Sequence, residues 1–437
     1  MDIENKVPIR RVFTEDLHEV LLAGWVNHVR NLGGLKFLQL QDRTGIVQIV
    51  LRKKSIPPEI FKIDFSKGDI IAVRGEVIVN PQAPRGKEVL PLEIQVLNKR
   101  QREYPISINS KIETNPDKRY DYRFLDLRNR SVSLIFEIES AVAYAFQDYF
   151  HREGFLQFFS PKIVDSATES GANVFEIDYF GRKAYLAQSP QFYKQMMLIA
   201  GFEKVFEIGP VFRAEKFHTT RHLCEYTSID FEIAFINDQH KVMATLESAI
   251  KYVINKVHVE KEEELKELGV ELSKETKSWP ILPITYAYDI VRSEGKDIED
   301  YTDLDAEAER IIGQYVKDKW NSDFVFVDRY PWKVRPFYTM KDDTDPQLTK
   351  SFDLLYRGQE LTTGGQREHR IEVLEKQALE KGIKLEEIES YLSFFRHGTP
   401  PHGGSGTGIE RMVQKMLQLD NIREARLLPR DPSRLSP

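Results

Sequence analysis

Arginines in one stretch of the chain occur with the residue types that could hold a triphosphate. Arg213 and Glu215 precede a loop with Arg221 and His222, and a β-run then returns to Glu232. Guanidinium groups pair with phosphate oxygens through two parallel hydrogen bonds, so this pattern could cradle a nucleotide. Taken alone, the same charges could equally form surface ion pairs.

A second stretch far downstream favours the nucleotide interpretation. Gly404, Gly406 and Gly408 alternate along a glycine-rich run, and the helix expected after it would present Arg411. The run lacks the G-x-G-x-x-G spacing of a dinucleotide-binding turn, and the chain has no G-x-x-x-x-G-K-[ST] loop. A P-loop nucleotide site is therefore excluded.

A zinc site is not favoured. His218, His222 and Cys224 lie close together, but no C-x-x-C accompanies them and no fourth ligand is evident. Cys224 is the single cysteine, which rules out a disulfide within the chain and fits a reducing compartment.

The elements that must position these residues follow an α+β pattern. A helical periodicity runs from Ser133 to about Gly154, and helical stretches then alternate with β-runs at residues 205–208, 226–235 and 323–327. We therefore expect a domain over residues 131–437 in which helices flank a sheet.

The first hundred residues predict a different domain. Five β-runs separated by turns lie at residues 20–28, 35–41, 46–51, 70–79 and 89–97. Five short strands fit an OB-fold barrel over residues 1–104, a fold that commonly binds single-stranded nucleic acid. The polar, arginine-rich residues 105–130 are interpreted as a hinge.

Charge is distributed unevenly between these regions. Residues 1–130 carry 23 Lys and Arg against 17 Asp and Glu, whereas residues 131–437 carry 39 against 51. A basic first region suggests contact with a polyanion. No apolar run is long enough to cross a membrane, and the first residues do not form a signal peptide, so we expect a cytoplasmic protein.

The order of the motifs resembles that of the class II aminoacyl-tRNA synthetases, specifically the aspartyl enzymes of the archaeal and eukaryotic type. Residues 159–161 resemble motif 1 at the dimer interface, residues 212–232 resemble motif 2, and residues 406–411 resemble motif 3. Residues 186–195 resemble the aspartate-specific loop. The resemblance spans essentially the whole chain and implies an all-β OB-fold barrel plus an α+β catalytic domain built on an antiparallel sheet flanked by helices.

By this resemblance, ATP is the substrate and Mg²⁺ the cofactor. The implied catalytic cations are Arg213, at the α-phosphate and the attacking carboxylate, and Arg411, at the γ-phosphate. Asp353 and Glu360 resemble carboxylates that hold Mg²⁺, an ion that prefers oxygen ligands. The complete implied ATP site consists of Arg213, Glu215, Arg221, His222, Tyr226, Glu360 and Arg411.

The resemblance also implies a site for L-aspartate. Arg367 would bind the β-carboxylate through two hydrogen bonds, with Lys194 as a second cation. The α-ammonium would be surrounded by Glu169, Ser189, Gln191 and Asp230. Asparagine would turn amide donors toward cations that are themselves donors, and such mismatches discriminate by about 10⁴-fold without editing.

The partner implied for the barrel is tRNA(Asp). Phe37 would stack on an anticodon base, while Arg30, Gln48 and Glu88 match positions that contact base edges. Whether tRNA(Asn) is also charged depends in this family on residues near Asn27, His28 and Pro84. Asn27 is ambiguous, and Pro84 favours at least partly relaxed recognition. A homodimer through motif 1 around Pro161 is implied as well.

Three alternatives remain open at this point. A nondiscriminating enzyme would place aspartate on both tRNA(Asp) and tRNA(Asn). A non-catalytic RNA-binding relative would lack some nucleotide residues, yet Arg213, Glu215, Asp353, Glu360 and Arg411 are all present. An asparaginyl enzyme would not be expected to place Lys194 opposite an uncharged amide. One departure from the family pattern is Thr363, where serine is usual.

Overall fold

The computed structural model describes residues 1–108, 114–165, 174–216, 219–272 and 276–437. Contacts within the chain divide it into two compact units, residues 1–133 and residues 134–437. The division lies close to the end of the predicted hinge at residue 130.

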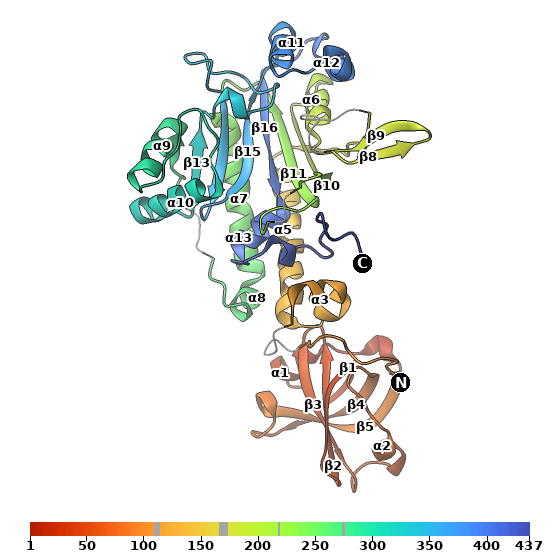
Figure 1. Cartoon of the computed structure of the whole chain (residues 1–437). Coiled ribbons are helices and arrows are strands. Elements are labelled where there is room, and N and C mark those ends of the chain that lie inside the picture. The colour runs from red at the N-terminus through yellow and green to blue at the C-terminus, as the bar shows by residue number, and fades with distance from the viewer. Residues whose placement is uncertain (109–113, 166–173, 217–218, 273–275) are drawn as a thin grey trace. The chain divides into compact units, whose positions relative to one another are not determined.

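The first unit contains a closed five-stranded barrel with the strand order β1-β2-β3-β5-β4 (Figure 1). All five predicted β-runs form strands, and inward-facing apolar side chains such as Leu38, Leu40 and Ile49 fill the interior. The strands are β1 Glu19–Asn31, β2 Leu35–Asp42, β3 Gly45–Arg52, β4 Ile70–Val79 and β5 Lys87–Asn98, with the short helices η1 Ile3–Asn5, α1 Ile9–Thr14, α2 Pro58–Lys62 and η2 Pro84–Gly86.

The segment predicted as a hinge contains two ordered helices, α3 Pro116–Asp121 and α4 Arg123–Asp126. Arg123 Nη1 lies 2.7 Å from Asp126 Oδ2, and both side chains are buried. Removing one partner of such a pair would leave an uncompensated buried charge, so this segment has structure of its own.

The second unit is built on an eight-stranded sheet with the order β12-β13-β14-β15-β16-β11-β10-β6. Its six central strands are antiparallel neighbours, and a parallel pair closes each edge. A separate three-stranded sheet has the order β7-β9-β8. The strands are β6 Leu156–Gln157, β7 Ile163–Val164, β8 Glu176–Tyr179, β9 Arg182–Leu186, β10 Lys204–Phe212, β11 Glu225–Ala234, β12 Ile281–Pro283, β13 Phe324–Asp328, β14 Ser351–Tyr356, β15 Glu360–Arg367 and β16 His402–Gly408.

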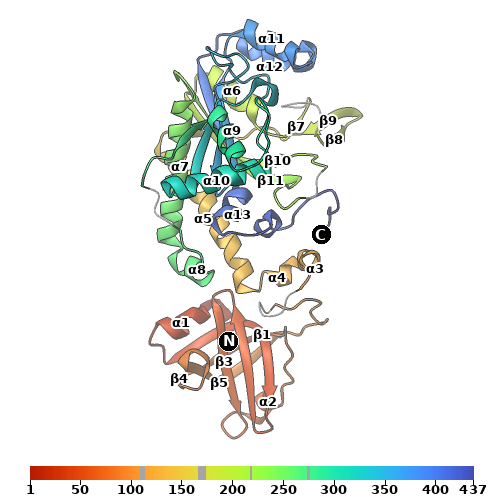
Figure 2. The ribbon, with the colours of Figure 1, turned by 60° about the vertical axis from the view of Figure 1, so that its left-hand side comes forward.

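Helices α5, α7 and α13 bury one face of the large sheet (Figures 1 and 2). Phe146 from α5, Ile250 from α7 and Met412 from α13 share one apolar core with Phe231 of β11. The helix expected from Ser133 to Gly154 is confirmed as α5, Arg130–Arg152. Because this face is sealed by apolar packing, the polar side chains of the same strands are left to the opposite face.

The remaining helices lie around the edges of the sheet. Helices α9 and α10 pack against each other and against β13, and α6 packs beside α12 (Figure 2). The helices of this unit are α5 Arg130–Arg152, α6 Gln191–Ile199, α7 His240–Glu260, α8 Glu262–Glu267, α9 Ile284–Ser293, α10 Ala306–Trp320, η3 Trp332–Val334, α11 Ile371–Glu380, η4 Leu385–Ile388, α12 Glu389–Phe395, α13 Ile409–Met416 and η5 Ile422–Ala425.

Candidate active site

The glycine-rich run forms strand β16, between two strands that carry charged side chains. Its partners pair Gly404 with Glu232 of β11 and Gly406 with Asp230, so these residues share one face of the sheet. A Cβ atom on Gly404 would lie 2.1 Å from Glu232 Oε2. The glycines are therefore needed because the neighbouring carboxylates occupy the space above the strand.

A β-bulge aligns the functional residues of β15. Asp353 of β14 pairs with Thr363, and Leu355 pairs with Glu360, which leaves one extra residue on β15 between these pairs. The extra residue shifts the side-chain alternation of β15 by one position, so Glu360 and Thr363 face the same side of the sheet. Without the bulge, the alternation along the strand would turn Glu360 toward the core.

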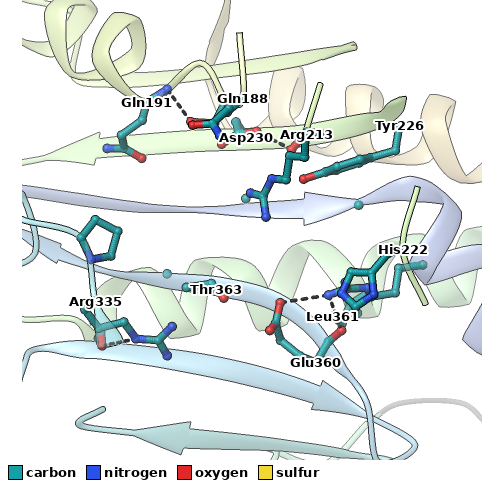
Figure 3. A pocket seen from close by; sticks show the side chains of 18 of the residues that line it. Gln188, Gln191, Arg213, His222, Tyr226, Asp230, Arg335, Glu360, Leu361 and Thr363 are labelled. Atoms are coloured by element: carbon teal, nitrogen blue, oxygen red, sulfur yellow. Dashed lines mark hydrogen bonds and ion pairs between the residues drawn. The ribbon is translucent and has the colours of Figure 1, made fainter. Parts of the chain in front are cut away.

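The cavity on this face has a volume of about 380 Å³ and gathers residues from the whole second unit. In Figure 3, Arg213 and Tyr226 lie side by side on one wall, across from Glu360 on the other. The predicted site residues that line it are Ser189, Gln191, Lys194, Arg213, Glu215, Arg221, His222, Tyr226, Asp230, Glu360, Arg367 and Arg411.

Two predicted residues need separate comment. Glu169 lies outside the described residues. Asp353 faces the cavity side of the sheet but does not line the cavity, and its Oδ1 atom lies 2.7 Å from Nη2 of Arg335, which does. Burial raises the pKa of Asp353 to about 6, although Arg335 acts in the opposite direction.

Cations surround the end of the cavity that is predicted to bind ATP. The Arg213 guanidinium lies 5.7 Å from the centre of the Tyr226 ring, and Arg411 Nη1 donates to Glu360 Oε1 at 2.9 Å. Burial alone would raise the pKa of Glu360, but the cations Arg411, Arg335 and Arg213 outweigh it and lower that pKa. Such a cluster can neutralise a polyphosphate in a partly dehydrated site.

Four charged side chains form the end that is predicted to bind the amino acid. Lys194 Nζ lies 3.1 Å from Asp230 Oδ1 and 3.1 Å from Glu232 Oε2, and it donates to Ser405 O at 3.2 Å. Arg367 Nε donates to Glu232 Oε1 at 3.0 Å. The two cations and two carboxylates balance, and Glu232 connects both cations through its two oxygens.

A neutral histidine supports this end of the cavity. His402 is buried, its Nδ1 bonds Pro400 O at 2.8 Å, and its Nε2 lies 2.8 Å from Gln195 Nε2. A carbonyl can only accept, so His402 carries its proton on Nδ1 and accepts from Gln195 on Nε2. Burial lowers the pKa of His402 to about 4, which keeps the ring uncharged at neutral pH.

The motifs do not assign Glu232, Arg335 or Glu309. Glu232 could have been inferred, because it follows Asp230 by two residues on a strand and so shares its face. Arg335 belongs to no regular periodic element. Glu309 lies on helix α10, where its carboxylate pairs with Arg221. Burial raises the pKa of Glu309 to about 7.

The predicted anticodon residues lie on the same, outer face of the barrel strands, where Glu88 is only 2% exposed. The strand register pairs Arg30 with Phe37 and Gln48 with Glu88, while Phe37 lies opposite Val50, two residues from Gln48. Gln48 Nε2 donates to Glu88 Oε2 at 3.0 Å. The four side chains are thus placed together, and their contact with RNA stays a prediction.

Comparison with known proteins places this geometry in a family. The family described as "tRNA synthetases class II (D, K and N)" matches residues 115–432, and "OB-fold nucleic acid binding domain" matches residues 20–97. Within the described residues, no helix is long and apolar enough to span a bilayer.

Similar proteins include two archaeal enzymes. The chain is 46% identical to the aspartate–tRNA(Asp) ligase of Pyrococcus abyssi over 428 residues, which are 97% of this chain and 98% of the relative. It is also 46% identical to the aspartate–tRNA(Asp/Asn) ligase of Aeropyrum pernix over 424 residues, 96% of this chain and 95% of the relative.

Solved structures agree on the fold. An asparaginyl-tRNA synthetase from Pyrococcus horikoshii, complexed with asparaginyl-adenylate, superposes with a TM-score of 0.91 at 33% identity, covering 99% of each chain. A putative aspartyl-tRNA synthetase from Leishmania major superposes with a TM-score of 0.89 at 29% identity, covering 99% of this chain and 95% of that one. Because the family match covers residues 115–432 and the relatives are similar over nearly the whole chain, this chain belongs to the class II tRNA synthetases, in the aspartate–tRNA ligase family.

Proposed function

We propose that this chain activates L-aspartate with ATP and transfers it to the 3′ end of tRNA(Asp). The observation that carries the proposal is the convergence of four cations on one cavity. Lys194 and Arg367 lie at one end, Arg213 and Arg411 at the other, and they come from α6, β15, the end of β10 and α13. A cavity with cations at both ends suits a small diacid beside a triphosphate.

The first step joins two anions. The α-carboxylate attacks the α-phosphorus of ATP, a new O–P bond forms, and the bond to the β-phosphate oxygen breaks to release diphosphate. Arg213 would hold both reacting groups, which reduces their repulsion and lines up the attack. In the second step, a terminal tRNA hydroxyl attacks the activated carbonyl and AMP leaves.

No side chain is assigned as a general base. The attacking carboxylate is already ionised, and the phosphate of the adenylate can itself take the proton from the tRNA hydroxyl. The measurement that tests this assignment compares activation with transfer in neutral isosteres of the titratable site residues. A variant that loses transfer alone and keeps activation would contradict it.

The donors present fit Mg²⁺ as the cofactor. Glu360 supplies a carboxylate in the cavity wall, and Thr363 places a hydroxyl oxygen on the same face. We assign the metal to Glu360 first and keep Asp353 as the second predicted ligand, on the adjacent strand. When bound, Mg²⁺ would neutralise phosphate charge and favour departure of diphosphate.

For the RNA partner, we propose that the barrel face of Arg30, Phe37, Gln48 and Glu88 contacts the anticodon of tRNA(Asp). Pro84 is exposed. On the basis of this residue, partial recognition of tRNA(Asn) stays a finer prediction. The test is to charge purified tRNA(Asp) and tRNA(Asn) transcripts with labelled aspartate or asparagine at equal concentrations. Aspartate on tRNA(Asp) supports the main proposal, and charging of tRNA(Asp) alone would refute the relaxed form.

Exposed apolar side chains near motif 1 support a homodimer. Phe159 is 79% exposed and Ile163 is 49% exposed, next to Pro161. The buried Ser160, which donates to Glu207 Oε2 at 2.7 Å, fixes the backbone that presents them. We propose that a second copy covers this surface. Sedimentation tests the dimer: the wild type should sediment as a dimer and Phe159→Asp as a monomer.

We also propose that the protein works in the cytoplasm.

A further inference from the structure

Glu309 connects two parts of the ATP-binding wall without lining the cavity itself. It lies on α10, which is capped by Asp305, and its side chain is only 9% exposed. One oxygen, Oε2, accepts from Arg221 Nη2 and also from the backbone N–H of Glu360, at 3.2 Å from that nitrogen. A single carboxylate oxygen thus links the motif 2 loop to the first residue of β15.

Arg221 needs such a partner because it lies in a loop rather than on a strand. Strand β10 ends at Phe212 and β11 begins at Glu225, so Arg221 lies outside both strands. An arginine side chain loses about 2 kcal/mol of conformational entropy when it is ordered. If Glu309 already orders the Arg221 side chain in the free enzyme, ATP binding does not have to supply that part of the entropy cost.

We propose that Glu309 is a positioning residue for Arg221, and through it for the triphosphate end of ATP. This inference rests on the proposed function. Glu309 touches no ligand in this scheme: its carboxylate holds one guanidinium nitrogen of Arg221, and Arg221 itself lines the cavity. Two rival roles would behave differently. If Glu309 competed with ATP for Arg221, its removal would strengthen ATP binding. If Glu309 only linked α10 to β15, its removal would not affect ATP binding selectively.

The main test uses Glu309→Gln in the full chain at pH 8. The substitution keeps an oxygen that can accept from the Glu360 N–H, but it replaces the ion pair with Arg221 by a hydrogen bond from the guanidinium to an uncharged amide oxygen. We expect KM for ATP in aspartate-dependent ATP–diphosphate exchange to rise about 10-fold. KM for aspartate and kcat should stay within twofold. Glu307→Gln, an exposed change on the same helix, is the matched control and should leave all three constants unchanged.

A double-mutant cycle separates the positioning role from a structural one. If Glu309 acts through Arg221, Glu309→Gln should add nothing to the effect of Arg221→Ala on KM for ATP. An unchanged or lower KM for ATP in Glu309→Gln would overturn the proposal, as would a full additional effect in the Arg221→Ala background. Equilibrium binding of ATP to the same variants measures the effect of Glu309 on ATP affinity even if the wild type shows no aspartate-dependent exchange. Absence of exchange in the wild type would count against the proposed function alone.

Discussion

Arg367, which is predicted to bind the β-carboxylate of aspartate, gives the most direct test of how the pocket would recognise an acid. Its Nε donates to Glu232 Oε1 at 3.0 Å and its Nη2 donates to Gly404 O at 2.9 Å. These bonds use two of the five N–H donors of a guanidinium, so the group can be fixed by the protein and still offer donors to a substrate carboxylate. Lysine keeps the charge but has one nitrogen, which cannot serve Glu232, Gly404 and a ligand from a single position.

We therefore expect Arg367→Lys to lose about one charge-assisted hydrogen bond to the substrate. Such a bond contributes about 1.5–3 kcal/mol, which corresponds to a fall of about 10- to 150-fold in kcat/KM for aspartate. KM for ATP should change by less than about twofold, because ATP is expected at the other end of the cavity. ATP–diphosphate exchange, with each substrate varied in turn, measures both quantities.

A matched control is available three residues further along the chain. Arg370 is half-exposed, pairs with the buried carboxylate of Glu368 and does not line the cavity, so Arg370→Lys should leave both substrates unaffected. The reasoning fails if Arg367→Lys keeps kcat/KM for aspartate within threefold of the wild type. It also fails if the constants for ATP and aspartate worsen equally, since that would indicate general damage.

Three further changes test other parts of the structure. Gly404→Ala should lower the free energy of unfolding by about 1–3 kcal/mol and displace Glu232, because its Cβ would lie 2.1 Å from that carboxylate, whereas Gly408→Ala meets nothing closer than 3.7 Å and should unfold like the wild type in urea. Equal unfolding midpoints for these two variants would contradict the packing argument. His402 has a pKa lowered to about 4, so below pH 6.5 its imidazole binds a proton in the unfolded chain but not in the folded chain. This difference should lower the free energy of unfolding by about 3 kcal/mol as the pH falls from 6.5 to 4. His402→Gln should unfold with a correspondingly shallower pH dependence between those limits, and identical slopes would argue against a neutral buried ring. Phe37→Ala should reduce kcat/KM for tRNA charging by about 5- to 150-fold through lost base stacking while amino-acid activation without tRNA is unchanged, and Phe37→Tyr should restore charging. A Phe37→Ala variant that charges tRNA normally would remove Phe37 from the RNA-binding face.

The sequence predicted those features that depend on local periodicity and on motif residues. The five barrel strands, helix α5 and the glycine-rich strand that leads into α13 are all present at the expected places. The cavity also gathers Lys194, Arg213, Arg367 and Arg411, the cations implied by the family resemblance.

Features that depend on tertiary packing were beyond such reasoning. Arg335 covers Asp353 from an irregular segment, and Glu309 reaches Arg221 across 88 positions of sequence from a helix with an ordinary solvated face. The β-bulge that aligns Glu360 with Thr363 is a difference of one residue between paired strands. None of these has a local signature, since each depends on which strand or helix happens to lie alongside.

The likeness of this fold to an asparaginyl enzyme shows what must decide between an acid and an amide. A TM-score of 0.91 means that the backbone alone cannot discriminate, so side-chain chemistry must. Net charge is not sufficient either, because Lys194 and Arg367 are already balanced by Asp230 and Glu232. Lys194 donates to Asp230 Oδ1 and Ser405 O and forms an ion pair with Glu232 Oε2, so protein groups already compensate its charge. Selection of aspartate would then depend on the donors that Arg367 can still offer, which an amide nitrogen cannot accept.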